Sequence, residues 1–123
     1  MKVLVCGGRD FADADTLDAW LDHIHETRGP ITMIIEGDAR GADRLARKYA
    51  KRRRIPCVTF KPDWASYNDA AGPIRNRQML IEGRPDLVVA FPGGAGTANM
   101  IKQATGVVNV IIASKANIPH RER

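Results

Sequence analysis

Cysteine is scarce in this sequence, and so are long runs of apolar residues. Only two of the 123 residues are cysteines, Cys6 and Cys57. Both lie in short apolar stretches, which favours buried free thiols in a reducing compartment over a disulfide framework. No apolar run approaches the length of about 20 residues that crosses a bilayer, and the start of the chain lacks the pattern of a secretory signal. We therefore expect a cytoplasmic protein with no membrane association.

Metal-binding and nucleic-acid-binding motifs are also missing. His23 and His25 lie two residues apart in a helical pattern, so they face apart, and the histidines show no metal-ligand spacing. We expect no metal and no cofactor. A dense basic run, RLARKYAKRRR at 44–54, coincides with the outward faces of a helical pattern. A solvated helix face is the favoured interpretation, and nucleic-acid binding stays open as the less favoured one.

The composition is that of an ordinary folded domain. Of the residues, 44% are hydrophobic and 27% are charged, which provides enough apolar material for a sheet covered by helices. The length indicates one domain, with residues 1–113 as its body and 114–123 as a polar tail. The formal net charge of +5 favours anionic partners, but it does not separate nucleotides from nucleic acid or acidic proteins.

Apolar runs alternate with helical patterns along the chain. In one segment, Leu17, Trp20, Leu21 and Ile24 recur at the spacing of an amphipathic helix. The predicted strands are 2–6, 31–36, 56–60, 86–91 and 107–112. The predicted helices are 16–27, 41–54, 73–83 and 97–105.

This alternation predicts an α/β fold, namely a single-domain, doubly wound parallel sheet of about five strands with helices on both faces. The favoured strand order is 3-2-1-4-5, in which the first and fourth strands are neighbours whose crossover helices leave to opposite faces. Ligands bind in such sheets in the crevice beyond the carboxyl ends of those two strands. We therefore expect the functional site between the loop after 2–6 and the loop after 86–91.

Both of these loops are rich in glycine, reading CGGRDF and FPGGAGT. Glycines let a backbone approach a ligand closely, and successive amides followed by a helix N-terminus attract an anion. Thr97 can cap that helix and also offer a hydroxyl. One glycine pair alone would fit a tight turn, but two pairs meeting at the crevice favour a phosphate cradle. Its predicted residues are Gly7, Gly8, Gly93, Gly94, Gly96 and Thr97.

Charged residues accompany the glycines. Arg9 and Asp10 follow the first pair. Arg9 suits a phosphate because a guanidinium binds two oxygens at once, and Asp10 suits either a ribose hydroxyl or an ion pair with Arg9. Arg40, in the loop after 31–36, is a second candidate anion partner. Asp43 begins the next helix, where it either contacts the ligand or complements the helix dipole.

The segment 61–72 is predicted to be a long loop without regular structure, a length that is more often functional than idle. It contains Trp64 and Tyr67, which either stack on a base or sugar or pin the loop to the body. Arg75 and Asn76 fall in the first turns of the following helix. We expect Asn76 to contact the base or sugar as well.

Four segments together resemble one family. They are GGRDF at 7–11, GDARGADRLA at 37–46, DWASYNDAAGPIRNRQML at 63–80 and FPGGAGTANMI at 91–101. PGGAGT resembles the PGGxGT signature of the Rossmann-like SLOG superfamily, and the full set resembles its small bacterial and phage proteins of the YspA type (the DUF2493 group). The resemblance covers nearly the whole chain and agrees in motif order and spacing. It implies a Rossmann-like nucleotide-binding domain and a homodimer.

The resemblance extends to the LOG phosphoribohydrolases, which hold a nucleoside monophosphate over the PGGxGT loop and cleave its N-glycosidic bond. Their motif continues to a catalytic Glu, and the matching position here is Met100. Their second element, an Arg four residues before a Met, matches Arg75 and Met79. A different carboxylate would therefore have to stabilise the oxocarbenium-like transition state. The candidates are Asp10, Glu36, Asp38, Asp43 and Asp63.

Three functions follow as hypotheses. The first is binding of a nucleotide-derived small molecule, with a LOG-like phosphoribohydrolase activity that would use Asp10, Asp43 and Arg75. The second is a non-catalytic sensor or sequestering protein for a nucleotide-derived signal, which the missing Glu favours. The third is nucleic-acid binding through 41–54 and the glycine loops.

Overall fold

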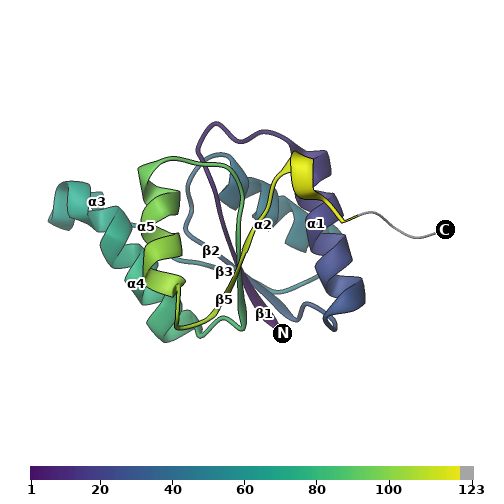
Figure 1. The fold of residues 1–123 in the computed structure, drawn as a ribbon. Helices are drawn as coiled ribbons and strands as arrows, with labels where there is room; N and C mark the ends of the chain where they lie inside the picture. Colours follow the sequence, from purple (N-terminus) through teal and green to yellow (C-terminus); the bar gives the residue numbers. More distant parts are fainter. Residues whose placement is uncertain (120–123) are drawn as a thin grey trace.

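The computed structural model describes residues 1–119, which form a parallel sheet with helices on both faces (Figure 1). The strands are β1 (Lys2–Cys6), β2 (Met33–Glu36), β3 (Cys57–Thr59), β4 (Leu87–Ala90) and β5 (Asn109–Ile112). The helices are α1 (Ala14–Thr27), α2 (Ala42–Arg53), α3 (Trp64–Tyr67), α4 (Ala71–Gly83) and α5 (Ala95–Ala104). Two 3₁₀ turns are η1 (Asn68–Ala70) and η2 (Lys115–Asn117).

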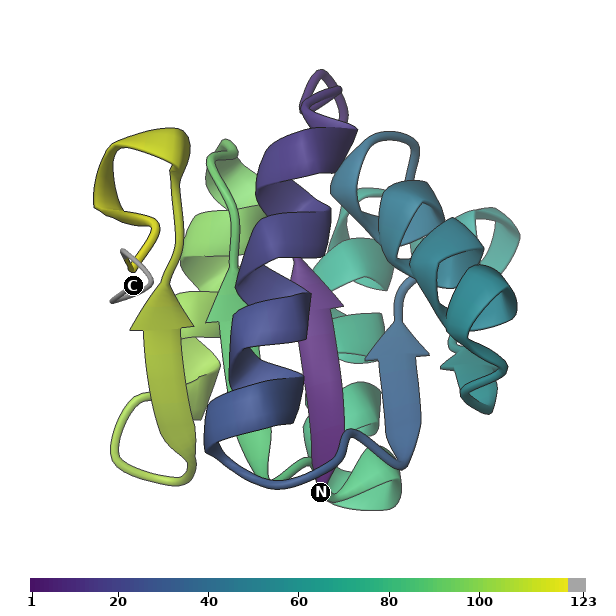
Figure 2. The same cartoon turned by 90° about the vertical axis from the view of Figure 1, so that its right-hand side faces the viewer.

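The strand order is β3-β2-β1-β4-β5, and every neighbouring pair is parallel. β1 lies at the centre, with Leu4 opposite both Ile35 of β2 and Val88 of β4. In Figure 2 the strands all run in one direction, and the loops that follow them gather along the upper edge of the sheet. The predicted fold class and strand order are confirmed, and the order reverses between β1 and β4.

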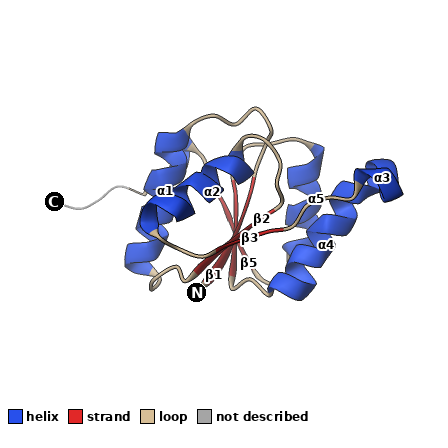
Figure 3. Cartoon of the chain, turned by 180° about the vertical axis from the view of Figure 1, so that it is seen from behind, coloured by secondary structure: helices blue, strands red, loops and turns tan. Residues whose placement is uncertain are grey.

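The sheet separates two cores because side chains alternate along each strand. In β1, Val3 and Val5 join the core under α1 and α2, whereas Leu4 and Cys6 join the core under α4 and α5. Figure 3 shows these two pairs of helices on opposite sides of the sheet. The apolar residues predicted to form the inner face of α1 all lie in the first core.

The prediction of an irregular loop over 61–72 is wrong. Trp64 and Tyr67 begin and end the one-turn helix α3, η1 follows it, and α4 begins two residues earlier than predicted. The Asp63 side chain accepts a hydrogen bond from the Ser66 amide (3.1 Å) and thereby caps α3. Figure 1 shows α3 at the outer end of α4, away from the sheet.

The glycine loop after β4 also differs from the prediction. α5 begins at Ala95, so Thr97 lies inside its first turn and does not cap it. The N-cap residue is Gly94, and no side chain makes a capping hydrogen bond there. The first amides of α5 therefore have no partner within the helix.

The polar tail predicted over 114–123 is only partly visible, because residues 120–123 lie outside the described residues. Ser114 and Asn117 form a reciprocal cap around η2. The indole nitrogen of Trp20 donates a hydrogen bond to the Ser114 carbonyl (3.0 Å). The start of the tail is therefore held against α1.

Both cysteines are free thiols, as predicted; Cys6 is buried and Cys57 is only partly buried. Among the described helices, none combines the length and apolar character needed to cross a membrane. Within residues 1–119, no group of three or more His, Cys, Asp or Glu side chains is placed to hold a metal ion.

The loops after β1 and β2 approach each other so closely that glycine is required between them. Gly41 has a φ of +76°, and a Cβ atom there would overlap the carbonyl oxygen of Gly8. The same oxygen accepts hydrogen bonds from the amides of Phe11 (3.2 Å) and Ala42 (3.3 Å). The start of α2 is therefore fixed to the β1 loop.

Replacing Gly41 should lower the free energy of unfolding, because it disrupts the close contact between Gly41 and Gly8. Gly106 provides the matched control, because it also has a positive φ (+84°) but nothing within 4 Å of an added Cβ. Gly106→Ala should lower the free energy of unfolding by about 1–2 kcal/mol, the cost of a left-handed alanine. Gly41→Ala should cost at least about 2 kcal/mol more, because overlap with Gly8 forces the loops apart. Urea denaturation measures both, and equal losses would contradict the close contact.

Candidate ligand-binding site

A cleft of about 1430 Å³ opens at the carboxyl edge of the sheet. Its walls come from the loops after β1, β2 and β4, from the first turn of α5, and from α3 and α4. This is the position where the strand order reverses, and where ligands bind in doubly wound folds. Tyr67, Glu36 and Asp63 do not line this cleft, and every other residue that the sequence proposed for the site does. Their roles toward a ligand stay predictions.

The two glycine loops are in direct contact. The Gly8 amide donates a hydrogen bond to the Pro92 carbonyl (2.8 Å). A Cβ at Gly8 would lie 2.9 Å from the Cα of Gly93, and a Cβ at Gly93 would lie 2.5 Å from the Gly8 nitrogen. Both distances are shorter than real Cβ contacts, so larger residues would push the loops apart. The structure thus joins the two loops that the sequence placed at one crevice.

The first turn of α5 presents unpaired amides to the cleft. Within the described part of the chain, the amides of Ala95, Gly96 and Thr97 donate no hydrogen bond to backbone or side chains. A Cβ at Gly94 or Gly96 would meet nothing within 4 Å, so the backbone there faces open space. Amides at a helix N-terminus carry a partial positive charge. This arrangement can accept a phosphate.

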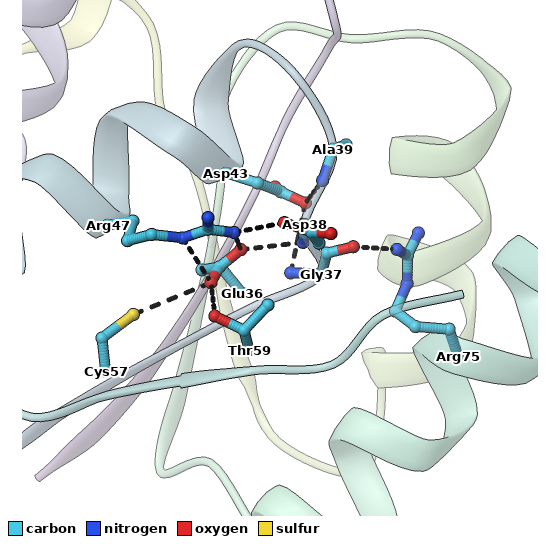
Figure 4. Close-up of polar contacts among 9 residues, drawn as sticks. All are labelled: Glu36, Gly37, Asp38, Ala39, Asp43, Arg47, Cys57, Thr59 and Arg75. Atoms are coloured by element: carbon cyan, nitrogen blue, oxygen red, sulfur yellow. Dashed lines mark hydrogen bonds and ion pairs between the residues drawn. The ribbon is translucent and has the colours of Figure 1, made fainter. Parts of the chain in front are cut away.

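Glu36 is enclosed by a complete set of donors (Figure 4). Its side chain is fully buried and accepts two hydrogen bonds from the Arg47 guanidinium (3.1 and 3.3 Å) and one from the Asp38 amide (2.7 Å). The Thr59 hydroxyl and the Cys57 thiol donate to the same carboxylate. Glu36 therefore holds β2, β3 and α2 together, and it does not line the cleft.

Asp38 and Asp63 are also occupied. The Arg47 guanidinium forms an ion pair with Asp38, and the hydrogen bond between them lowers the pKa of the Asp38 carboxyl. Asp63 caps α3 and lies outside the cleft. Two of the five candidate acids then remain at the cleft without an ion pair: Asp10, which is exposed, and Asp43, which is buried.

Asp43 combines burial with a position in the cleft wall. Its Oδ2 accepts hydrogen bonds from the amides of Gly37 (3.2 Å) and Ala39 (3.1 Å), as Figure 4 shows. Burial raises its pKa to about 6, and the Ala39 hydrogen bond and the Arg75 charge oppose that rise only in part. A carboxyl group with such a pKa can exchange a proton near neutral pH.

Arg75, on α4, is held in place at the cleft wall. Its guanidinium donates to the Gly37 carbonyl and to the Asn76 side chain (3.0 Å). Burial lowers its pKa, and the nearby Asp43 charge raises it. Asn76 in turn donates to the Gly96 carbonyl (3.2 Å) and to the Asn99 side chain (3.1 Å). This chain of contacts fixes α4 against the first turn of α5.

The position of the LOG-type catalytic Glu is part of the core. Met100 is fully buried and packs with Met79 under α4 and α5. A carboxylate at this position would lose its hydration, so the hydrophobic residue belongs to the packing of this chain. No carboxylate of α5 reaches the cleft, since the helix AGTANMIKQA contains none.

Sequence reasoning missed several residues of the cleft wall. Arg44 lies in the first turn of α2, and the sequence had assigned it to the solvated basic run 44–54. Asn99 is two residues after Thr97 on α5, and Asp69 lies in η1, a turn that was predicted to be irregular. No motif pointed to Asp69.

The basic run on α2 is partly neutralised. Arg52 pairs with Asp18 (2.7 Å) and Arg53 pairs with Asp22 (3.1 Å), both acids being on α1. Arg47 pairs with Glu36 inside the fold. These contacts agree with a helix face that is packed and solvated, the favoured interpretation of this run.

Comparisons with known proteins point to one family. Residues 1–67 match the model of YAcAr, described as the YspA, cpYpsA-related SLOG family. The Gene 61 protein of Mycobacterium phage D29 is 34% identical over 112 residues, which cover 84% of this chain and 87% of that protein. Among solved structures, glycinamide ribonucleotide transformylase 1 from Symbiobacterium toebii matches with a TM-score of 0.49 and 21% identity. That match covers 83% of this chain and 46% of the transformylase, so the chain spans less than half of its length.

The raised pKa of Asp43 should make the free energy of unfolding fall as the pH rises. Because its pKa rises from 3.8 to about 6, the folded state keeps a proton that the unfolded state has released between these values. The contribution of Asp43 to the free energy of unfolding is therefore full below about pH 4 and is lost as the pH rises through about 6, by roughly 3 kcal/mol. Asp43→Asn, which does not titrate, should remove this slope in urea unfolding measured across that range.

Asp38→Asn is the matched control. Arg47 lowers the pKa of Asp38, so the contribution of this carboxylate is full above about pH 4 and is lost only below it. Asp38→Asn should lower stability by a constant amount from about pH 5 to 7 and should keep the Asp43 slope. An Asp43→Asn protein with the wild-type slope would show that the pKa of Asp43 is not raised.

Proposed function

Since this chain belongs to the YspA, cpYpsA-related SLOG family, we propose that it binds a nucleotide or phosphoribosyl-type ligand with a phosphate over residues 93–97. The observation that carries this proposal is the set of unpaired amides at Ala95, Gly96 and Thr97, which face a cleft. A phosphate there would accept several backbone hydrogen bonds and complement the dipole of α5. Arg9 lies in the adjoining loop after β1 and can neutralise the remaining charge.

The remainder of the ligand would lie along the cleft toward α3. Trp64 lines the cleft and is 47% exposed, so its ring is available for stacking on a base or sugar. Asp10 lies in the loop after β1 and lines the cleft, where its carboxylate can accept a hydrogen bond from a ribose hydroxyl. Tyr67 is also half exposed but lies outside the cleft wall, which favours Trp64 as the stacking residue.

Two functions are compatible with such binding. Met100 in the core, with Glu36 and Asp38 engaged elsewhere, favours a non-catalytic sensor or sequestering protein. Asp43 favours LOG-like N-glycosidic hydrolysis, because a buried carboxyl with a pKa of about 6 lines the same cleft. Arg75, fixed beside it, would hold the ligand in position.

The homodimer implied by the family resemblance stays a prediction. Ile74 and Ile81 lie seven residues apart on α4 and are 42% and 58% exposed, respectively. Their spacing places both on one helix face. This face of α4 is our proposed site for contact with a second copy.

Gly94→Val should abolish phosphate binding without unfolding the protein. An added side chain at Gly94 meets no atom of the chain within 4 Å, so it would occupy the space proposed for the phosphate. Thermal denaturation with and without AMP is the measurement, since a ligand that binds only the folded state raises its stability. Ala116→Val, at an exposed position in η2, is the control and should keep the full stabilisation. Equal stabilisation of Gly94→Val and wild type would refute the phosphate position.

Release of free base from nucleoside monophosphates separates hydrolysis from sensing. If the wild type releases base, Asp43→Asn should lower the rate by at least about a hundredfold, the usual contribution of general acid–base catalysis. The stabilisation by ligand should persist in this variant, because the amides of α5 are unchanged. A wild type that is stabilised by nucleotide but releases no base establishes the non-catalytic function. Base release that survives in Asp43→Asn excludes Asp43 as the catalytic acid.

A further inference from the structure

The cleft contains arginines that have no partner in the protein. Four arginines line it, and one of them, Arg75, is held by Gly37 and Asn76. The side chains of the other three arginines make no hydrogen bond or ion pair with any residue in 1–119. They are Arg9, Arg40 and Arg44. We call them the arginine trio.

Other arginines of α2 show that this lack of partners is local to the cleft. Arg47, Arg52 and Arg53 all form ion pairs, and they lie further along the same helix. Arg44 acts on Asp38 only through its charge at longer range, because Asp38 is already paired with Arg47. The trio therefore places at the cleft positive charge that no ion pair neutralises.

The acidic residues of the cleft do not neutralise the trio. Asp43 uses its Oδ2 for the amides of the β2 loop, and Asp38 pairs with Arg47. Asp10 and Asp69 line the cleft, but neither forms an ion pair with a described residue. An anion that entered the cleft beside the trio would therefore meet arginines that have no competing bond to break.

The trio lies apart from the amides of α5. Arg9 lies in the loop after β1, and a Cβ at Gly41 would lie 2.6 Å from the Arg9 carbonyl oxygen, so the backbone of Arg9 contacts the residue next to Arg40. Arg44 is in the first turn of α2. The α5 amides follow β4, on the other side of β1. Strands are spaced about 4.8 Å apart, so the loop after β2 and the start of α2 lie two spacings, roughly 10 Å, from the loop after β4.

The size of the cleft agrees with a ligand that reaches both regions. Its volume of about 1430 Å³ exceeds the range of roughly 300–1000 Å³ that holds a typical small ligand. One phosphate on the α5 amides, neutralised by Arg9 of the adjoining loop, would leave Arg40 and Arg44 unoccupied. A guanidinium binds phosphate with two parallel hydrogen bonds, and three of them suit a dianionic group.

We propose that the arginine trio forms a second anion subsite, and that the ligand is a nucleotide with at least two phosphate groups. This inference rests on the proposed function, because it assumes that the first phosphate lies on the amides of α5. The second phosphate is either joined to the first, as in a nucleoside diphosphate, or lies on the far side of the ribose. Both have the same chemistry toward the trio.

Calorimetric titration with one- and two-phosphate nucleotides tests the subsite. AMP is compared with ADP and with adenosine 3′,5′-bisphosphate, and the guanine counterparts guard against a base preference. At least one two-phosphate ligand should bind about tenfold or more tighter than the monophosphate, since a charge-assisted hydrogen bond is worth that much. The better of the two identifies the position of the second phosphate.

Substitutions in the arginine trio then test whether these arginines cause the tighter binding of two-phosphate nucleotides. The measured quantity is the affinity for the two-phosphate nucleotide divided by the affinity for the monophosphate. Arg40→Gln and Arg44→Gln should each reduce this ratio several-fold, and the double variant should bring it close to one. Arg28→Gln, an exposed arginine outside the cleft, should keep the wild-type ratio. Circular dichroism confirms that the variants fold.

The outcomes separate this inference from the proposed function. Binding of AMP that Gly94→Val abolishes, with no advantage for two phosphates, would overturn the subsite and leave the proposed function standing. A ratio that does not change in the double variant would also overturn it. No binding of any nucleotide would overturn both. Tighter binding of a single-stranded oligonucleotide that depends on the trio would replace the small-molecule ligand by nucleic acid.

Discussion

The contact between backbone atoms of three loops determines the form of this site. Gly8 lies between Gly41 and Gly93, and a side chain at either neighbour would overlap its main chain. The Gly8 carbonyl accepts amides from its own loop and from α2, and the Gly8 amide donates to Pro92. Loops after β4, β1 and β2 are therefore fixed relative to each other before any ligand binds. Such preorganisation reduces the entropy lost on binding.

The same contacts decide which polar groups remain available. Glu36 is fully satisfied by Arg47, Thr59 and its own loop, so its charge is used for structure. The side-chain amide of Asn76 donates a hydrogen bond to the Gly96 carbonyl and so fixes the first turn of α5. The groups that remain available at the cleft include the amides at the start of α5, the arginine trio and the carboxyls of Asp10, Asp43 and Asp69. Amides at a helix N-terminus and guanidinium groups are groups that bind phosphate in proteins.

The sheet and the place of the cleft could be predicted from the sequence because they depend on long-range patterns. Buried runs of apolar residues such as LVVA predicted strands covered on both faces, and alternation with helices predicted their order. The glycine pairs stood at the correct strand ends. These signals survive errors of a residue or two in the boundaries.

Details that depend on local hydrogen bonds could not be predicted in this way. α3 was missed because a single capping bond from Ser66 to Asp63 sets a helix of only one turn. Thr97 was taken for a cap because the start of α5 was placed two residues late. The engagement of Glu36 follows from Arg47 and Thr59, which lie 11 and 23 residues away and which no motif connects with it.

The central claim is that a phosphate binds the backbone amides at the start of α5. Titration of ¹⁵N-labelled protein with AMP and ADP, followed by two-dimensional NMR, observes each amide directly. The account predicts that Ala95, Gly96 and Thr97 show the largest saturable shift changes, together with Gly8 in the adjoining loop. Saturable changes confined to the outward face of α2, for example at Lys48 and Lys51, with the α5 amides unmoved, would contradict it.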